Sequence, residues 1–226
     1  MIDGVLARLA ELVLLPVIEI PDPALAVPLA DSLIEGGLPC AEITFRTPGA
    51  AKAIQEIARL RPDVLLGAGT VRSTDQVDSA IDAGATFLVT PGLSAPVVQH
   101  AIASGVPIMP GVCTPTELEM ALELGADVVK FFPAQPAGGP GYLRALIAPY
   151  PSVRFVPTGG ISASTLADYL AIRQVVAVGG SWMAPRELIA ASDFGAITER
   201  VRQAEQLVRE LRPTQSTRPA QPTEPI

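Results

Sequence analysis

Three consecutive stretches of the chain repeat one order of residues: a glycine, a short apolar run and a proline. The glycines, Gly84, Gly105 and Gly125, are 21 and 20 residues apart. Glycine supplies the left-handed cap that ends a helix. A continuous apolar run is typical of a strand that is buried on both faces, as strands of parallel sheets are. The repeat therefore predicts a succession of short βα units.

Runs rich in Val, Ile and Leu alternate in the same way with Ala-rich amphipathic stretches along most of the chain. We expect strands over 13–20, 40–45, 64–68, 87–90, 107–109, 128–132, 154–157 and 175–178. Helices are expected over 24–35, 49–60, 74–83, 95–103, 116–124, 142–147, 164–170 and 195–211. Eight such units in 226 residues suit a single-domain α/β fold, the (β/α)8 TIM barrel. A doubly wound open sheet is the alternative.

The composition changes after Leu211. Residues 213–226 contain four prolines and almost no apolar side chains. Such a segment buries too little apolar surface to offset the entropy that is lost on ordering. We therefore expect a barrel domain over 1–212 and a disordered, proline-rich tail over 213–226.

Charge and composition argue against several classes of protein. The chain has 16 basic and 23 acidic residues and no basic run, which is unlike a nucleic-acid-binding protein. No segment reaches the ~18 apolar residues of a membrane helix, and the first residues do not resemble a signal peptide. Two cysteines are too few for a disulfide framework. We expect a cytoplasmic protein that binds neither nucleic acid nor a membrane.

Two scarce residue types narrow the chemistry. His100 is the single histidine, so a histidine-based metal site or a Ser-His-Asp triad has almost no material. Only two of the 16 basic residues are lysines, Lys52 and Lys130. Lys52 falls in an expected helix with Gln55 and Glu56 nearby, and we interpret it as a solvated surface residue. Lys130 is then the candidate amine nucleophile.

Lys130 lies in the run Gly-Ala-Asp-Val-Val-Lys-Phe-Phe-Pro (125–133). Alternation along a strand puts Val128, Lys130 and Phe132 on one face. Burying an ammonium group is costly, and desolvation favours a neutral amine that can attack a carbonyl carbon and form a Schiff base. The alternative is a structural lysine that is salt-bridged in the core or extends its amine to solvent.

Glu42, Thr44 and Arg46 alternate with apolar residues, so the three side chains share one face of a strand. If the apolar face packs on the helices, Glu42 and Arg46 point into the barrel. Glu42 is then a candidate general acid–base, and Arg46 a candidate for bidentate binding of a carboxylate. A salt-bridge network that contains both residues is an equally good interpretation of this spacing.

Glycine-rich stretches follow three of the expected strands. Gly67-Ala68-Gly69-Thr70 closes the third strand, where a ligand can approach the backbone and the Thr70 hydroxyl. A capping or loop threonine is the preferred interpretation of that stretch alone. Thr158-Gly159-Gly160 and Gly179-Gly180-Ser181 follow the last two strands, where backbone amides of barrels commonly bind phosphate. A pair of tight turns is the alternative.

Together, five motifs resemble those of the 2-keto-3-deoxy-6-phosphogluconate (KDPG) aldolases, class I aldolases that often also cleave 4-hydroxy-2-oxoglutarate (KHG). They are Glu-Ile-Thr-Phe-Arg-Thr-Pro (42–48), Gly-Ala-Gly-Thr-Val (67–71), Lys-Phe-Phe-Pro-Ala (130–134), Pro-Thr-Gly-Gly-Ile (157–161) and Gly-Gly-Ser-Trp (179–182). The resemblance covers roughly residues 10–210. It implies a homotrimeric (β/α)8 barrel that uses no metal or other cofactor and acts on a phosphorylated keto acid.

The resemblance also implies roles for the matching residues. Lys130 corresponds to the Schiff-base lysine, and Glu42 to the acid–base residue that moves protons. Arg46 and Thr70 correspond to residues that hold the pyruvate carboxylate. The phosphate loops correspond to Gly159, Gly160, Gly180 and Ser181, and further substrate contacts are expected from Pro91, Phe132 and Thr158.

Glu19 departs from the pattern, because some relatives carry a basic residue at the end of the first strand. A carboxylate there is not expected to help an anionic substrate. The run Ile-Thr-Phe-Arg-Thr-Pro after Glu42 favours the gluconate epimer, since the 6-phosphogalactonate aldolases resemble Pro-Leu-Asn-Ser-Pro at that place. A metal-free phosphosugar isomerase and a non-catalytic assembly protein are the remaining alternatives.

Overall fold

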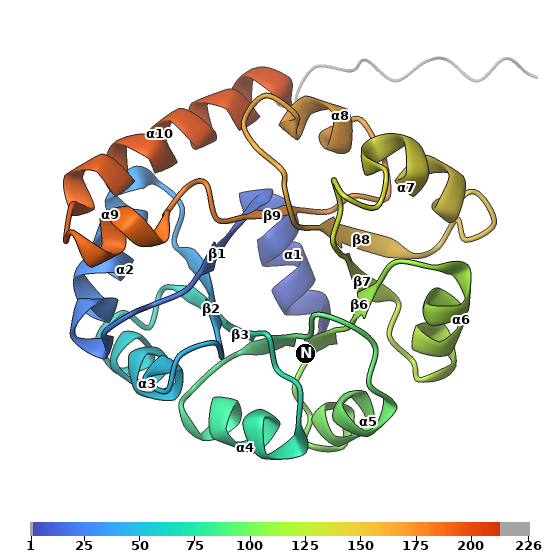
Figure 1. Cartoon of the computed structure of the whole chain (residues 1–226), viewed down its shortest axis with the longest axis horizontal. Helices are drawn as coiled ribbons and strands as arrows, with labels where there is room; N and C mark the ends of the chain where they lie inside the picture. The colour runs from blue at the N-terminus through green and yellow to red at the C-terminus, as the bar shows by residue number, and fades with distance from the viewer. Residues whose placement is uncertain (1, 213–226) are drawn as a thin grey trace, which may run out of the picture.

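A computed structural model describes residues 2–212, with side chains from residue 4 onward, and shows a ring of strands inside a ring of helices (Figure 1). The strands are β1 (Leu14–Ile18), β2 (Cys40–Thr44), β3 (Leu65–Gly69), β4 (Phe87–Val89), β5 (Ile108–Met109), β6 (Gly111–Val112), β7 (Val128–Phe131), β8 (Arg154–Pro157) and β9 (Val178–Gly180). The helices are α1 (Ile2–Leu12), α2 (Ala26–Gly36), α3 (Ala50–Leu60), α4 (Thr74–Asp82), α5 (Ala95–Ala103), α6 (Pro115–Glu123), α7 (Gly139–Ile147), α8 (Leu166–Leu170), α9 (Arg186–Ala190) and α10 (Phe194–Leu211), with a 3-10 turn over Pro23–Leu25.

All paired strands are parallel and form two runs, β5-β4-β3-β2-β1-β9 and β6-β7-β8. Pro110 separates β5 from β6 because proline has no N–H to give to a ladder. Its carbonyl still accepts a hydrogen bond from the Lys130 amide at 2.9 Å, so β5 and β6 are two parts of one strand. A bridge between Thr158 and Gly179 joins the β8 side to β9. The expected (β/α)8 barrel is confirmed, and the open sheet is excluded.

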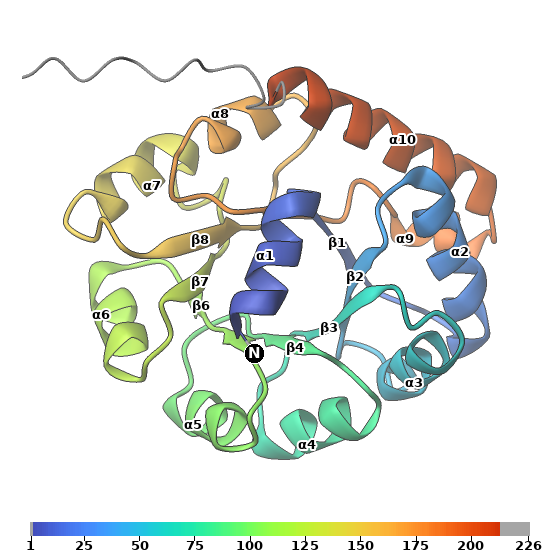
Figure 2. The same ribbon diagram turned by 180° about the vertical axis from the view of Figure 1, so that it is seen from behind.

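The first helix was not expected from the sequence. α1 crosses the centre of the ring on the side seen in Figure 2 and leads directly into β1, so it covers the amino ends of the strands. Leu6 and Leu9 are buried beneath it. Because α1 closes this end of the barrel, the carboxyl ends of the strands remain as the open end.

The last strand differs from its expected range. We expected residues 175–178, whereas β9 is Val178–Gly180 and Val175 forms only an isolated bridge with Phe155. The pair Gly179-Gly180 is therefore part of the strand, and the loop begins at Ser181. The helix α9 is a further element that the pattern did not indicate. The tail expected over 213–226 lies outside the described residues.

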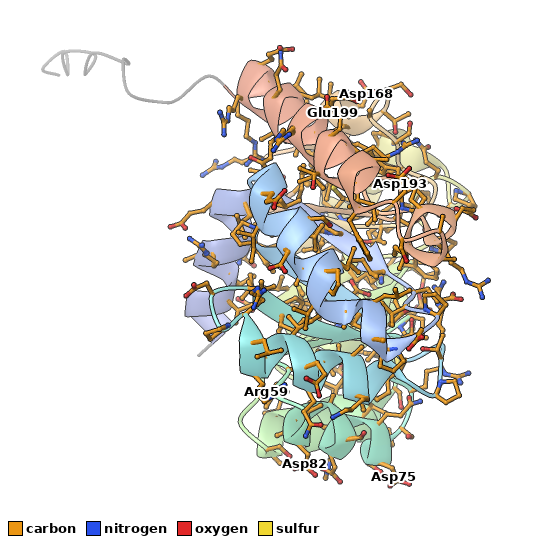
Figure 3. The ribbon with its side chains drawn as sticks, turned by 90° about the vertical axis from the view of Figure 1, so that its left-hand side faces the viewer. Arg59, Asp75, Asp82, Asp168, Asp193 and Glu199 are labelled. Carbon is orange, nitrogen blue, oxygen red and sulfur yellow. The ribbon has the colours of Figure 1, made fainter. Side chains whose placement is uncertain are left out.

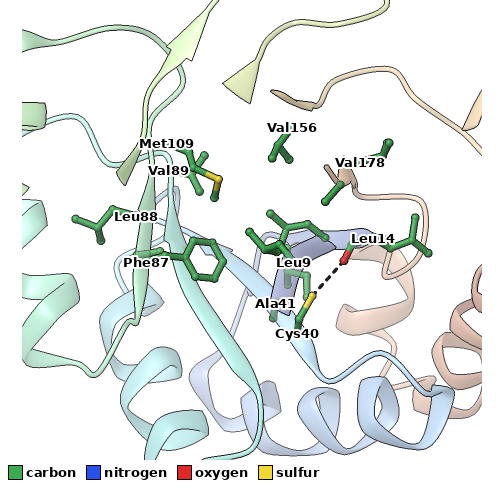
Figure 4. Packing of buried hydrophobic residues seen from close by; sticks show 14 of the residues in the cluster. Leu9, Leu14, Cys40, Ala41, Phe87, Leu88, Val89, Met109, Val156 and Val178 are labelled. Atoms are coloured by element: carbon green, nitrogen blue, oxygen red, sulfur yellow. Dashed lines mark hydrogen bonds between the residues drawn. The ribbon is translucent and has the colours of Figure 1, made fainter. Parts of the chain in front are cut away.

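The core consists of apolar side chains from the inner ring, and Figure 4 shows part of it around Phe87 and Val178. Cys40 belongs to this core, where its thiol donates a hydrogen bond to the Leu14 carbonyl at 3.3 Å. Burial strongly raises the pKa of the Cys40 thiol, so this side chain acts as a small neutral filler. Charged residues lie on the outer helices, as the labelled Arg59 and Asp75 show in Figure 3.

Candidate active site

A cavity of about 520 Å³ opens beside the carboxyl ends of the strands, where active sites of barrels are found. Its lining comes from the units of β1, β2, β7, β8 and β9. The lining residues are Val17, Glu19, Thr44, Arg46, Phe132, Thr158, Gly159, Gly160, Ile161, Gly180, Ser181, Trp182, Ala184, Pro185, Arg186 and Glu187.

The structure brings the two expected catalytic residues together. Lys130 Nζ lies 3.2 Å from Glu42 Oε1, and the two side chains are 6% and 1% exposed. β2 and β7 are four strands apart in a ring of eight, so the pair meets across the barrel. The Lys130 amine also lies 5.3 Å from the ring centroid of Phe132, which lines the cavity. The pair is thus buried next to the cavity.

The two oxygens of the Glu42 carboxylate differ in hydrogen bonding. Oε1 accepts from Lys130, whereas Oε2 is buried and has no hydrogen-bond partner among the described residues. A buried acceptor without a partner is unfavourable, and such atoms are rare in folded proteins. This oxygen is therefore available to a ligand hydroxyl or a water.

Gly69 at the end of β3 makes room for this carboxylate. A Cβ at residue 69 would lie 2.6 Å from Glu42 Cγ and 2.7 Å from its Cδ. The glycine that the sequence suggested for ligand approach thus serves first to admit the Glu42 side chain. The Glu42 side chain is held between β3 and Lys130.

The glycines after β8 have the backbone expected of a tight loop. Gly159 and Gly160 have φ values of 105° and 75°, in the left-handed region that favours glycine. Neither amide donates a backbone–backbone hydrogen bond within residues 2–212. Their N–H groups are therefore available to an anion, next to Gly180 and Ser181 in the same cavity.

Arg46 lies elsewhere than its spacing suggested. β2 ends at Thr44, and Arg46 lies in the following turn with a half-exposed side chain. Its Nη1 is 3.9 Å from Glu19 Oε2, and Glu42 pairs with Lys130 instead. The salt-bridge network considered between Glu42 and Arg46 is therefore not the one formed.

Thr70 and Pro91 do not line the cavity. Thr70 directly follows Gly69 and has a positive φ of 57°. Thr70 and Pro91 are both partly buried. Pro91 packs against Gly111, the residue that pairs with Lys130 in the β6–β7 ladder. Both residues therefore lie on the Lys130 and Glu42 side of the site, away from the glycine loops.

Sequence reasoning missed Arg186 at the start of α9. Its Nε lies 3.2 Å from Glu19 Oε1, and its side chain lines the cavity. A basic residue shortly after the Gly-Gly-Ser-Trp motif was the signal that could have indicated it. Glu187, the next residue, also lines the cavity.

Residues 2–212 contain neither a cluster of metal ligands nor a membrane-spanning helix. No group of three or more His, Cys, Asp or Glu side chains is arranged to hold a metal ion. None of the helices in this range is both long and apolar enough to span a bilayer.

Comparison with known proteins identifies the family. The family profile described as KDPG and KHG aldolase matches residues 5–200. The chain belongs to this aldolase family. The 2-dehydro-3-deoxy-phosphogluconate aldolase of Treponema pallidum is 51% identical over 86% of this chain and 92% of its own length. The KHG/KDPG aldolase of Escherichia coli K12 is 41% identical over 84% of this chain and 89% of its own length.

Among aldolases of solved structure, the KDPG aldolase of Legionella pneumophila superposes with a TM-score of 0.85. The two sequences are 38% identical, and the match covers 88% of this chain and 97% of that chain. The Legionella structure holds pyruvate captured at low pH as a covalent carbinolamine intermediate. A carbinolamine forms when an amine adds to a carbonyl carbon, which is the first step of Schiff-base chemistry.

Proposed function

We propose that this protein is a class I aldolase that cleaves KDPG to pyruvate and glyceraldehyde 3-phosphate through a Schiff base on Lys130. The observation that carries the proposal is the buried pair of Lys130 and Glu42, whose Nζ and Oε1 atoms lie 3.2 Å apart beside the cavity. The KDPG aldolase relatives support the substrate. The KHG/KDPG relative supports cleavage of KHG to pyruvate and glyoxylate as a second activity.

The reaction starts at the Lys130 amine, which attacks the C2 carbonyl carbon of the substrate and forms a carbinolamine. Glu42 supplies the proton with which the hydroxyl leaves as water. The iminium then accepts the electron pair of the C3–C4 bond, while Glu42 takes the proton of the C4 hydroxyl. Glyceraldehyde 3-phosphate departs, the enamine is protonated at C3, and water hydrolyses the resulting iminium to release pyruvate.

The two oxygens of Glu42 suit this sequence of proton transfers. Oε1 contacts the nucleophilic nitrogen, and the unpartnered Oε2 can reach a substrate hydroxyl directly or through one water. Arg46, Thr70 and Pro91 are proposed contacts of the pyruvate end. Phe132 and Thr158 are proposed contacts of the middle of the substrate. The amides of Gly159, Gly160, Gly180 and Ser181 are proposed to bind the phosphate.

Borohydride reduction in the presence of pyruvate tests the covalent step. The wild-type protein should be trapped as a stable adduct on Lys130, located by peptide mass spectrometry. Lys130→Ala should lose both the adduct and aldol cleavage, because Lys130 supplies the amine. Lys52→Ala is the matched control, since Lys52 is the other lysine of the chain and its side chain is 58% exposed. Full cleavage by Lys130→Ala would refute the mechanism.

Substrate comparison separates the alternatives. A phosphosugar isomerase would need no borohydride-sensitive amine, and an assembly protein would release no pyruvate in a lactate dehydrogenase-coupled assay. Preference for the galactonate epimer would show as a higher kcat/KM for that epimer. Glu42→Gln should lower turnover while still allowing slow trapping, because Lys130 remains.

A homotrimer in the cytoplasm is proposed together with this function. The exposed apolar side chains Ile102 and Met120 lie on the consecutive helices α5 and α6 and support a contact between copies there. The molar mass of the purified protein, measured by light scattering, should be three times the 23.5 kDa mass of one chain. A monomer at micromolar concentration would contradict the trimer and leave the aldolase mechanism untouched.

A further inference from the structure

One carboxylate bridges two arginines at the rim of the cavity. Glu19 Oε1 lies 3.2 Å from Arg186 Nε, and Glu19 Oε2 lies 3.9 Å from Arg46 Nη1. The three residues come from three adjacent units, because β9, β1 and β2 are neighbours in the sheet. The side chain of Glu19 is 27% exposed, whereas those of Arg46 and Arg186 are 50% and 62% exposed.

The two arginines follow different strands of the barrel. Arg46 follows β2, the strand whose Glu42 meets Lys130. Arg186 follows β9, whose last residue Gly180 belongs to the proposed phosphate site. Arg186 therefore follows the strand that contributes Gly180 to the proposed phosphate site.

The negative charge of a phosphoryl group favours a cation beside the proposed phosphate site. A phosphoryl group carries a charge of about −1.5 to −2 at neutral pH. The glycine amides supply hydrogen bonds but no net charge. Among the described residues that line the cavity, Arg46 and Arg186 are the cations, and Glu19 and Glu187 are the carboxylates. Arg186 is the cation nearer in sequence to the phosphate loop, and the planar guanidinium fork matches phosphate oxygens.

We propose that Arg186 binds the phosphoryl group of the substrate and that Glu19 positions its guanidinium. The inference rests on the proposed aldolase function and assigns a specificity residue to it. Glu19 contacts Arg186 through Nε, so the two terminal nitrogens can bind an anion. A carboxylate at the end of β1 thus serves an anionic substrate indirectly, by holding the cation that meets it.

A pair of substrates that differ only in the phosphate tests Arg186. We would measure kcat/KM for KDPG and for unphosphorylated 2-keto-3-deoxygluconate in the wild type and in Arg186→Ala. The ratio of the two values should fall about 10- to 100-fold in the variant, because a charge-assisted contact with phosphate is lost. Arg200→Ala removes the same charge at an exposed position of α10 that does not line the cavity, and it should leave the ratio unchanged.

Equal losses for both substrates, or an unchanged ratio, would overturn the role of Arg186. A wild-type protein that cleaves neither substrate would instead refute the proposed function. The two failures are therefore distinguishable in one set of assays. Inorganic phosphate gives a binding readout, since its inhibition constant against KDPG should rise in Arg186→Ala and stay constant in Arg200→Ala.

A double-mutant cycle tests the positioning role of Glu19. Glu19→Gln keeps the shape of the side chain, and it should raise KM for KDPG severalfold because Arg186 loses its anchor. In the Arg186→Ala background the same change should alter KM by less than about twofold, since Glu19 acts through Arg186. A lower KM in Glu19→Gln would show that the carboxylate only repels the phosphate. Additive effects would show that Glu19 acts independently of Arg186.

Discussion

Gly69 offers a way to move the Glu42 carboxylate without changing its chemistry. In Gly69→Ala the new Cβ would lie 2.6 Å from Glu42 Cγ and 2.7 Å from its Cδ. Carbon atoms in contact are optimally about 3.5–4.0 Å apart, so the carboxylate must withdraw by ~1 Å. Glu42 Oε1 is also too close to this Cβ, so its 3.2 Å contact with Lys130 Nζ cannot keep its present geometry.

The expected effect on turnover follows from this displacement. Moving a catalytic group by ~1 Å can cost about 10²-fold in rate, and general acid–base catalysis contributes about 10²–10⁴-fold in total. We therefore expect kcat of Gly69→Ala to fall roughly 10²-fold. Overpacking should lower the free energy of unfolding by about 1–3 kcal/mol. Gly69 has no positive φ, so backbone strain does not contribute.

Gly67→Ala is the matched control for this experiment. Gly67 lies two residues earlier on β3, and its Cβ would lie 2.7 Å from Phe87 Cδ2 in the core. This variant should lose comparable stability but keep kcat within a few-fold of the wild type. Pyruvate release would be measured with lactate dehydrogenase and divided by the folded fraction from circular dichroism. Wild-type kcat in Gly69→Ala, or equal losses of kcat in both variants, would refute the requirement for the position of Glu42.

Three further predictions concern stability. Partial burial acts to raise the pKa of Glu117, but hydrogen bonds from Cys113 and Thr114 outweigh burial and lower this pKa. The ionised Glu117 side chain therefore stabilises the fold above the ordinary pKa of glutamate. This stabilisation is lost as the pH falls through the lowered pKa of the folded state. In urea unfolding, Glu117→Gln should be destabilised by roughly 0.5–1 kcal/mol at pH 7, and the difference should shrink below about pH 4; a constant difference would contradict the linkage. Gly36→Ala should lose about 1–3 kcal/mol, because its Cβ would lie 2.6 Å from Val201 Cβ between α2 and α10. Gly4→Ala in α1 meets nothing within 4 Å and should gain up to about 1 kcal/mol, so a loss there would contradict the described packing of α1.

The apolar runs predicted most strands because burial on both faces leaves a continuous signal. The expected strand over 154–157 coincides with β8, Arg154–Pro157. The last strand was misplaced because Gly179 and Gly180 have no side chains to mark a strand, and the pattern pointed to the valines before them. α1 was missed because its apolar residues continue into the run of β1. α9 has only five residues, too few for a helical period to be distinguished.

The sequence predicted which single residues form the site, but it did not predict which of them contact one another. An inward lysine and an inward glutamate follow from alternation along their own strands. Their pairing joins residues 88 positions apart, and it depends on closure of the ring between β5, β6 and β7, which no local pattern encodes. The room for Glu42 depends in the same way on Gly69 of a third strand.

Glu19 shows why a charge cannot be assessed from its position in the sequence alone. Beside an anionic substrate a lone carboxylate is unfavourable, and on that ground no useful contact was expected from the end of β1. The structure places it between two guanidinium groups from the neighbouring units of β2 and β9. The relevant quantity is the summed charge of the three side chains, which is positive by one. Replacing a basic residue at this position is therefore compatible with an anionic substrate, provided that Arg186 supplies the charge from the adjacent unit.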